Sequence, residues 1–266
     1  MLAGASVFAQ QIWVGGYRGF GRFGGARFAK MEDFDGSFLY CRGYYESRYR
    51  EAGGSGWRTD YPGADNNFSV RLAELTRVPV KLDPDRQPHY VVVPLTDATL
   101  FRCPILFMED VGTAEFSQQD VKQLRDYFLK GGFLLTDDAW GSFAWTNWVE
   151  QIGRVLPPFE FPIEDIPISH AVMHMLYSVP NIPQVSNISF WSSTRGQTSE
   201  RGPDSAQVYF KGIFDAQRRL MVLMLHNTDI ADTWEREGAP PHEYFDLFSP
   251  RGYAIGVNII LYAMTH

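Results

Sequence analysis

The sequence predicts an α/β fold built on a mostly parallel sheet, and three observations support this. Residues 131–141, Gly-Gly-Phe-Leu-Leu-Thr-Asp-Asp-Ala-Trp-Gly, hold an apolar run that is too short for a helix and fits a strand buried on both faces. Residues 104–137 follow a strand-helix-strand pattern, whose crossover should be right-handed. The 266 residues are 45% hydrophobic, enough for the core of one large domain.

The other strands are predicted from aromatic and β-branched runs bounded by turn-forming residues. The run at 37–46 is expected near the edge of the sheet. A turn at 215–218 joins the last two runs, which suggests a hairpin. The predicted strands are residues 37–46, 90–94, 104–108, the central run that begins at 133, 207–214 and 220–225.

Helices are predicted from capping residues and from apolar side chains at helical spacing. Ser117 and Asp120 have the spacing of a capping box, and the helix that they begin stops at the glycines before the central strand. Asp65 or Asn66 is the predicted N-cap of an earlier helix, which should end near Arg77 because a proline follows two residues later. Two more helices are predicted at residues 145–155 and at about 252–264.

Composition divides the chain into three parts. Residues 1–11 are small and apolar and end near Val-Phe-Ala-Gln-Gln, which resembles the end of a secretory signal. This favours a periplasmic or secreted protein; the alternative is an ordinary N-terminus of a cytoplasmic one. Residues 12–36 form a Gly/Arg/aromatic-rich tail that packs locally or on a partner chain, and self-association through it is an open hypothesis. Residues 37–266 are expected to form a single α/β domain.

Charge and hydropathy limit the partners of the chain. A formal net charge of -7 argues against nucleic-acid binding, which requires a basic surface. No run approaches the roughly 18 apolar residues of a membrane span. Cys41 and Cys103 match no zinc or redox spacing, and whether they are bonded stays open. No cofactor and no metal are expected, and the partner is an unidentified small ligand or protein.

Three carboxylates are predicted at the carboxyl ends of neighbouring strands. Asp137 and Asp138 follow the central strand, and Glu109 follows the strand at 104–108. Ligands of open α/β sheets bind at this edge. One carboxylate of the adjacent pair should face the crevice while the other caps the following helix, because successive side chains of a strand point in opposite directions. The functional interpretation is a metal or sugar-hydroxyl anchor or a general acid and base; the structural one is capping and loop packing.

Histidines are weaker candidates. His170 and His174 are four residues apart, but no glutamate accompanies them as in zinc proteases. His170 is expected in a loop that folds over the carboxyl edge of the sheet, where it is either a catalytic group or a structural hydrogen-bonding residue. His226 follows a buried strand and should reach one end of the sheet. Ser142, His170 or His226, and Asp229 would complete a catalytic triad on paper, without the local sequence that such a nucleophile needs.

A mixture of aromatic rings and polar groups suggests a pocket for a hydroxyl-rich ligand. Aromatic residues make up 15% of the chain, so the alternative is that most of them belong to the core. The candidate ligand-binding residues are Trp57, Asp60, Tyr61, Trp140, His226, Asp229, Trp234 and Glu235.

The order of several motifs resembles the bacterial family DUF4159, a domain of unknown function, over residues 38–265. The motifs are Trp57-x-Thr59-Asp60-Tyr61-Pro62, Phe101-x-x-Pro104, Gly131-Gly132-Phe133-Leu134-x-x-Asp137-Asp138, His170, Asp229-x-x-x-x-Trp234-Glu235, and Gly256-Val257-Asn258 through Tyr262-Ala263.

The resemblance implies a class I glutamine amidotransferase-like fold, a flavodoxin-like three-layer sandwich. Enzymes of that fold place a cysteine in a Gly-x-Cys-x-Gly elbow between a strand and a helix. Residues 136–141, Thr-Asp-Asp-Ala-Trp-Gly, stand in that place, and neither Cys41 nor Cys103 lies in such a turn. The resemblance therefore implies a scaffold without its usual thiolate nucleophile.

Two functional hypotheses result. The favoured one is an exported, non-catalytic ligand-binding or assembly protein. The alternative is a hydrolase that acts on a saccharide or an amide through Asp137 or Asp138, together with Glu109 or His170.

Overall fold

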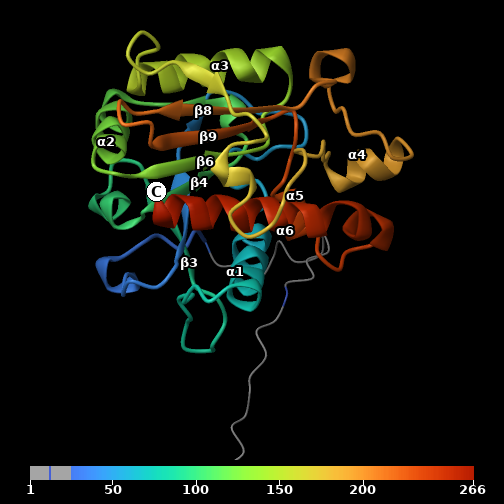
Figure 1. Cartoon of the computed structure of the whole chain (residues 1–266), viewed down its shortest axis with the longest axis horizontal. Coiled ribbons are helices and arrows are strands. Elements are labelled where there is room, and N and C mark those ends of the chain that lie inside the picture. Colours follow the sequence, from blue (N-terminus) through green and yellow to red (C-terminus); the bar gives the residue numbers. More distant parts are fainter. Residues whose placement is uncertain (1–11, 13–24) are drawn as a thin grey trace, which may run out of the picture.

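The computed structural model describes residue 12 and residues 25–266, and its centre is a seven-stranded sheet (Figure 1). The strands from β3 to β9 are parallel, while β8 is antiparallel to β9 and to β7, so the prediction of a mostly parallel sheet is confirmed. The predicted signal remnant at 1–11 and residues 13–24 of the predicted tail lie outside the described residues. In spatial order the strands are β3 (Tyr90–Pro94), β1 (Tyr40–Tyr44), β4 (Ile105–Met108), β6 (Phe133–Thr136), β9 (Leu220–His226), β8 (Tyr209–Phe214) and β7 (Ile163–Asp165).

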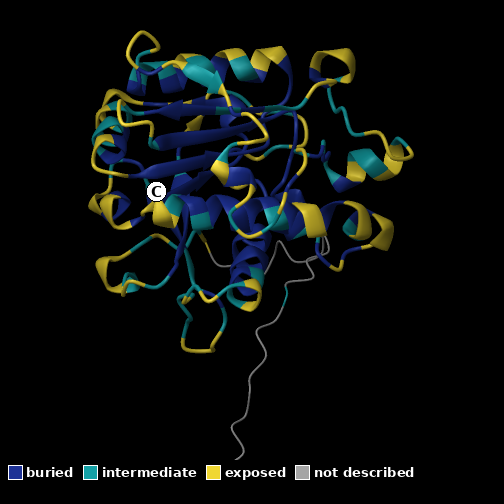
Figure 2. Ribbon diagram, in the orientation of Figure 1, coloured by how far each residue is buried: buried dark blue, intermediate teal, exposed yellow. Residues whose placement is uncertain are grey.

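Helices cover both faces of the sheet, so the fold is a flavodoxin-like three-layer α/β sandwich. Phe107 and Leu135 pack with Phe68 of α1 in one apolar cluster, whereas Leu106 and Leu134 pack with Trp148 of α3 in the other. Figure 1 shows α3 and α6 on opposite sides of the strands, and Figure 2 shows the strands between them buried. The first face carries α1 (Gly63–Leu75), α5 (Asp232–Glu235) and α6 (His242–Thr265), and the second carries α2 (Gln118–Leu129) and α3 (Gly141–Val155).

Short elements complete the chain around these layers. They are η1 (Met31–Asp33), η2 (Ala98–Arg102), η3 (Val111–Thr113), η4 (Ala171–Met173), α4 (Ile188–Ser193), η5 (Gly202–Ser205), and the separate two-stranded pair β2 (Glu46–Ser47) and β5 (Ala114–Glu115).

The predicted capping box and hairpin are both present. Ser117 Oγ accepts a hydrogen bond from the backbone N–H of Asp120 at 3.1 Å, and Asp120 Oδ2 accepts one from the backbone N–H of Ser117 at 2.8 Å. The two last strands, β8 and β9, pair antiparallel across the turn at 215–218. Local sequence signals therefore determine these elements correctly.

Three helix starts differ from the prediction, and one is that of α3, which begins at Gly141 rather than at residue 145. Helix α1 begins at Gly63, so neither Asp65 nor Asn66 is its N-cap; Asp65 is instead buried within the first turn. Helix α6 begins at His242, ten residues before the predicted start, and continues through Pro250. A proline inside a helix costs about 3 kcal/mol. Burial of apolar side chains on both sides of Pro250 compensates for this cost.

The end of the predicted tail packs on the sheet. The backbone N–H of Ala29 donates to Val92 O at 2.9 Å, and the N–H of Val92 donates to Arg27 O at 2.8 Å. Residues 27–29 therefore lie along the outer side of the edge strand β3. No helix in the described part of the chain has both the length and the apolar character needed to span a bilayer.

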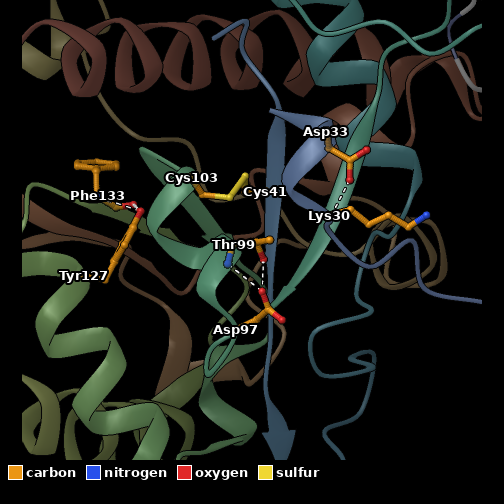
Figure 3. Close-up of a disulfide and its surroundings, with 8 residues drawn as sticks. All are labelled: Lys30, Asp33, Cys41, Asp97, Thr99, Cys103, Tyr127 and Phe133. Atoms are coloured by element: carbon orange, nitrogen blue, oxygen red, sulfur yellow. Dashed lines mark hydrogen bonds between the residues drawn. A yellow bond between two sulfur atoms is a disulfide. The ribbon is translucent and has the colours of Figure 1, made fainter. Parts of the chain in front are cut away.

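Cys41 and Cys103, whose pairing the sequence left open, form a disulfide bond (Figure 3). Cys41 lies in β1 and Cys103 directly precedes the residue before β4, so the bond joins the starts of two neighbouring strands. Both cysteines are almost fully buried, and their Cα atoms are 6.1 Å apart. The bond closes a loop with a sequence separation of 62 residues.

Loss of this disulfide should destabilise the fold. Closure of a long loop restricts the unfolded chain, so the Cys41→Ala/Cys103→Ala variant should lose about 2–4 kcal/mol in the free energy of unfolding. Urea denaturation followed by circular dichroism measures the change. Reductant should lower the midpoint of the wild type but not that of the variant; equal midpoints for all samples would contradict the role of the bond.

Candidate functional site

Acidic residues gather where three neighbouring parallel strands end. Strand β4 is followed by Glu109 and Asp110, and β6 is followed by Asp137 and Asp138. Strand β9, on the other side of β6, leads within three residues to Asp229. Because parallel strands end at one edge of the sheet, these side chains converge at the carboxyl edge, where ligands of this fold class bind. Figure 1 shows α4 and α5 beyond the same edge.

Each of these three strands ends in a sharp turn with a left-handed residue. The φ angles are 49° at Asp110, 55° at Asp138 and 63° at Asn227. Asp and Asn adopt this conformation more readily than other non-glycine residues, yet it still costs on the order of 1 kcal/mol at each position. Asp138 lies between β6 and α3, the position of a nucleophile elbow. The turns thus direct side chains into the space beyond the sheet at some cost in backbone energy.

A small acidic pocket opens at this edge. Its volume is about 250 Å³ including the open mouth. Trp140 forms part of the wall and donates from Nε1 to Asp138 Oδ1 at 2.7 Å. Five carboxylates and one arginine contribute to the lining, which consists of Glu51, Ala52, Gly53, Gly54, Asp110, Asp138, Trp140, Asn187, Glu200, Arg201 and Asp229.

A second acidic group lies deeper and shares Asp229 with the pocket. Asp60, Asp229 and Asp232 are all buried, and each offers a carboxylate oxygen within 4.8 Å of the other two. Asp60 comes from the loop before α1, whereas Asp232 is the first residue of α5. Within the described residues, Asp60 Oδ2 is buried without a hydrogen-bond partner. The pocket and the deeper group therefore form one acidic region, although the deeper group has an unsatisfied atom.

Arg42 provides much of the positive charge in this region. It is fully buried in β1, and its guanidinium holds the Asp65 carboxylate with contacts of 2.6 and 3.1 Å. It also donates to Thr59 O at 2.9 Å and lies 3.9 Å from Glu109 Oε1. Arg42 and Asp65 were not predicted as site residues, although a single arginine inside the aromatic run at 37–46 was the available signal.

Burial raises the pKa values of the carboxyl groups. Desolvation is the main cause at each of them, and repulsion between neighbouring carboxylates adds to it. The pKa of Asp60 rises to about 7, with Asp232 as the largest repelling neighbour. The pKa values of Asp110 and Asp137 rise to about 8. Asp138 and Asp229 also have pKa values well above the ordinary range because of burial. These carboxyl groups therefore bind protons when no other positive charge is present at the edge.

The adjacent aspartates face different ways, as expected, but one expected role is wrong. Asp138 lines the pocket. Asp137 Oδ2 accepts a hydrogen bond from the backbone N–H of Ala231 at 2.8 Å, at the start of α5. It does not cap the following helix α3, whose N-cap is Trp140. Asp137 continues the alternation of β6 toward the face of the sheet that α5 covers, away from α3.

Of the other predicted binding residues, Glu235, Trp57 and Tyr61 lie near the carboxyl edge, whereas Trp234 lies in the core. Glu235 is close enough to Asp60 and Asp232 to have its pKa raised to about 9, mainly by burial and then by their charge. Trp57 and Tyr61 pack on each other with ring centroids 5.6 Å apart, in the aromatic group beside Arg42. Trp234 is 1% exposed and packs on Phe68, so it belongs to the core and not to the pocket.

The structure places His170 at the opposite edge of the sheet. Its ring lies 5.8 Å from that of Phe214, the last residue of β8, which pairs with Leu220 at the start of β9. Its other ring neighbour is Tyr262 of α6, at 5.4 Å. The expected loop over the carboxyl edge is therefore not formed by this segment. The path of a proline-rich loop depends on tertiary packing, which local sequence does not encode.

His226 lies at the carboxyl edge, where it is packed between aromatic rings as a structural residue would be. Its Nε2 is 3.1 Å from Gly141 O, and its ring stacks between Trp145 and Tyr209. Burial is the main reason that its pKa is lowered. Ser142 Oγ donates to Asp204 Oδ2 at 3.1 Å, so the serine is engaged with an aspartate outside the proposed triad.

Family comparison agrees with the resemblance in the sequence. Residues 47–264 match the model of DUF4159, described as a domain of unknown function. The chain belongs to the DUF4159 family. A search of curated proteins finds no match. The DUF4159 match includes every pocket residue but not β1 with Arg42, and its description names no activity. The chemistry of the site therefore has to be argued from its geometry.

Replacement of Arg42 should strongly destabilise the protein. The Arg42→Met variant leaves Asp65 buried without its partner, and removal of one member of a buried pair costs about 3–5 kcal/mol. The Arg42→Met/Asp65→Leu variant should lose less than the sum of the two single variants, because it leaves no unpaired charge at this pair. Urea denaturation of the four proteins in a double-mutant cycle measures this coupling, and additive losses would argue against it.

The acidic edge should make stability depend on pH. The pKa of Asp60 is 3.8 ordinarily and about 7 when folded, so the folded state retains a proton that the unfolded chain releases between these values. The free energy of unfolding, measured with a chelator that keeps metal ions away from the carboxylates, should therefore fall as pH rises across this window. Asp60→Asn should reduce the slope by up to about 1.4 kcal/mol per pH unit.

The same measurement on Asp165→Asn is the control, because Asp165 is an exposed carboxylate of β7. Its slope should match that of the wild type. An Asp60→Asn protein with an unchanged slope would show that this carboxyl does not titrate as expected.

Proposed function

We propose that this DUF4159 protein is a non-catalytic binding domain that holds the cationic group of a small ligand at the carboxyl edge of its sheet. The observation that carries the proposal is the lining of the pocket, in which five carboxylates surround a single arginine. Such a lining favours a cation by charge-assisted hydrogen bonds, and the indole of Trp140 offers an apolar face beside them. The limited room suits one amine group rather than a large substrate buried whole.

The proposed lack of catalysis depends on the missing nucleophile. An amidotransferase-like scaffold would require a thiolate at the elbow, but Asp138 stands on the left-handed turn after β6. The two cysteines of the chain are bonded to each other, and Cys41 lies in the interior of the sheet. This arrangement supports a pseudoenzyme on an amidotransferase-like scaffold.

Export is part of the same proposal. Disulfides persist in oxidising compartments such as the bacterial periplasm and are rare in the cytosol. The Cys41–Cys103 bond therefore supports a periplasmic or secreted protein, in line with the signal-like sequence of residues 1–11.

A hydrolase is the second candidate, and a specific observation favours it. Asp138 and Asp110 line one pocket, and burial raises the pKa of both, as in a general acid. This pair takes the place of the expected pairing of Asp137 or Asp138 with Glu109 or His170. Glu109 is close to Arg42 and does not line the pocket, and His170 lies at the opposite edge. A hydrolase would show turnover of a saccharide or an amide that Asp138→Asn abolishes.

Binding of matched small molecules tests the proposed function. Putrescine carries ammonium groups, and butanediol of the same length carries hydroxyls instead. In calorimetry with chelator present, the protein should bind putrescine and not butanediol. Asp138→Asn removes a charge-assisted contact of about 1.5–3 kcal/mol, so affinity should fall roughly ten- to a hundredfold.

The control variant Asp165→Asn should bind putrescine like the wild type, since it lies outside the pocket. Raised salt should weaken the binding. Equal binding of the diol, or no binding of either compound, would refute recognition of a cationic group.

A further inference from the structure

Three aspartates from two segments of the chain meet below the pocket. Asp60, Asp229 and Asp232 come from the loop before α1, the turn after β9 and the first position of α5, and their carboxylate oxygens approach within 4.8 Å of one another. Oxygen ligands of Mg²⁺ and Ca²⁺ lie about 2.0–2.6 Å from the ion, so oxygens that share an ion are separated by at most about twice that distance. The three aspartates satisfy this limit for Ca²⁺, for which it is about 5 Å, whereas for Mg²⁺ the limit is about 4.2 Å.

An unsatisfied buried atom points independently to a ligand. Asp60 is only 8% exposed, and its Oδ2 has no hydrogen-bond partner among the described residues. Asp137 Oδ1, in the same acidic region, is also without one. A buried carboxylate oxygen without a partner is costly, and a protein that folds stably normally satisfies it. A cation between the aspartates would satisfy Asp60 directly.

Among the described residues, two arginines supply positive charge to this group, and both are shared with other carboxylates. Arg236 Nε lies 3.1 Å from Asp232 Oδ1. Arg42 favours the charged form of Asp60, but its guanidinium is hydrogen-bonded to Asp65. Asp137, Asp138 and Glu235 add further carboxylates around the group. The charges of Asp137 and Asp138 raise the pKa of Asp229, and those of Asp60 and Asp232 raise the pKa of Glu235. A divalent cation would offset this excess of negative charge.

We propose that Asp60, Asp229 and Asp232 bind a divalent cation that prefers oxygen ligands, such as Ca²⁺, beneath the acidic pocket. This inference rests on the proposed function only in that Asp229 belongs to both sites. An all-carboxylate set without histidine or thiolate favours Ca²⁺, Mg²⁺ or Mn²⁺ over zinc or copper.

Neighbouring groups hold two of the ligands in place. Asp232 Oδ2 accepts hydrogen bonds from the backbone N–H of Ile188 and from the Tyr244 hydroxyl, each at 2.9 Å. Asp229 Oδ1 accepts one from the backbone N–H of Asp232, also at 2.9 Å. Such supporting hydrogen bonds orient metal ligands in proteins. Asp60, by contrast, has the unsatisfied oxygen, so it is the ligand whose loss should matter most.

Cation titration of the chelator-treated full-length protein tests the proposal. Ca²⁺, Mg²⁺ and Mn²⁺ are each added alone while melting temperature and heat of binding are measured. At least one should raise the melting temperature, because a ligand that binds only the folded state stabilises it. Asp60→Asn should lose at least about tenfold in affinity for that ion, whereas Asp165→Asn should bind it like the wild type. No response of the wild type to any of the three ions, or full binding by Asp60→Asn, would overturn the proposal.

Asp60→Asn keeps the shape of the side chain and removes one repelling charge, so it should fold whether or not a cation binds; circular dichroism checks this. The amine titration contains chelator and the cation titration contains no amine. Failure of one therefore leaves the result of the other intact.

Discussion

The buried pair of Arg42 and Asp65 is the interaction on which the carboxyl edge depends. The pair joins β1 to α1, and Arg42 also holds the loop before α1 through Thr59 O. That loop carries Asp60, so the position of the deeper acidic group follows from a contact between the sheet and α1. The guanidinium also lies close to Glu109. Burial raises the pKa of Glu109, and the positive charge of Arg42 offsets part of this rise. A buried ion pair contributes little net stability by itself, but its geometry defines the shape of the edge.

The three left-handed turns serve the same edge in a different way. Asp110, Asp138 and Asn227 each follow a parallel strand, and the backbone cost at each turn is offset by the packed layers behind it. Asn227 shows how the turns support one another, because its Oδ1 accepts a hydrogen bond from the backbone N–H of Gly141 at 2.8 Å. The turn after β9 therefore supports the turn after β6. Backbone strain at three adjacent strand ends is consistent with the ligand site proposed at this edge.

Local patterns in the sequence were sufficient for much of the fold and for part of the site. Apolar runs, the Ser117 capping box and the strand-helix-strand unit predicted the central strands and located Asp137 and Asp138 at the carboxyl edge. Arg42 was missed because its partner Asp65 lies 23 residues away and its burial depends on that tertiary contact. His170 was placed at the wrong edge for a similar reason, since nothing in its own segment encodes which end of the sheet the loop crosses. Periodicity specifies which faces of helices and strands are buried, but it does not specify the contacts between distant loops.

The disulfide and the acidic edge act on the same pair of strands in opposite directions. Cys41 is adjacent to Arg42 in β1, and Cys103 anchors the chain just before β4, whose other end leads to Glu109 and Asp110. The bond stabilises the starts of these strands, while uncompensated carboxylates destabilise their ends as pH rises. Any positive charge that binds at the edge, whether a proton, a metal ion or an amine, relieves that repulsion and must therefore stabilise the fold as well. The proposed cation binding and the stability of the fold would thus be linked through one set of carboxylates.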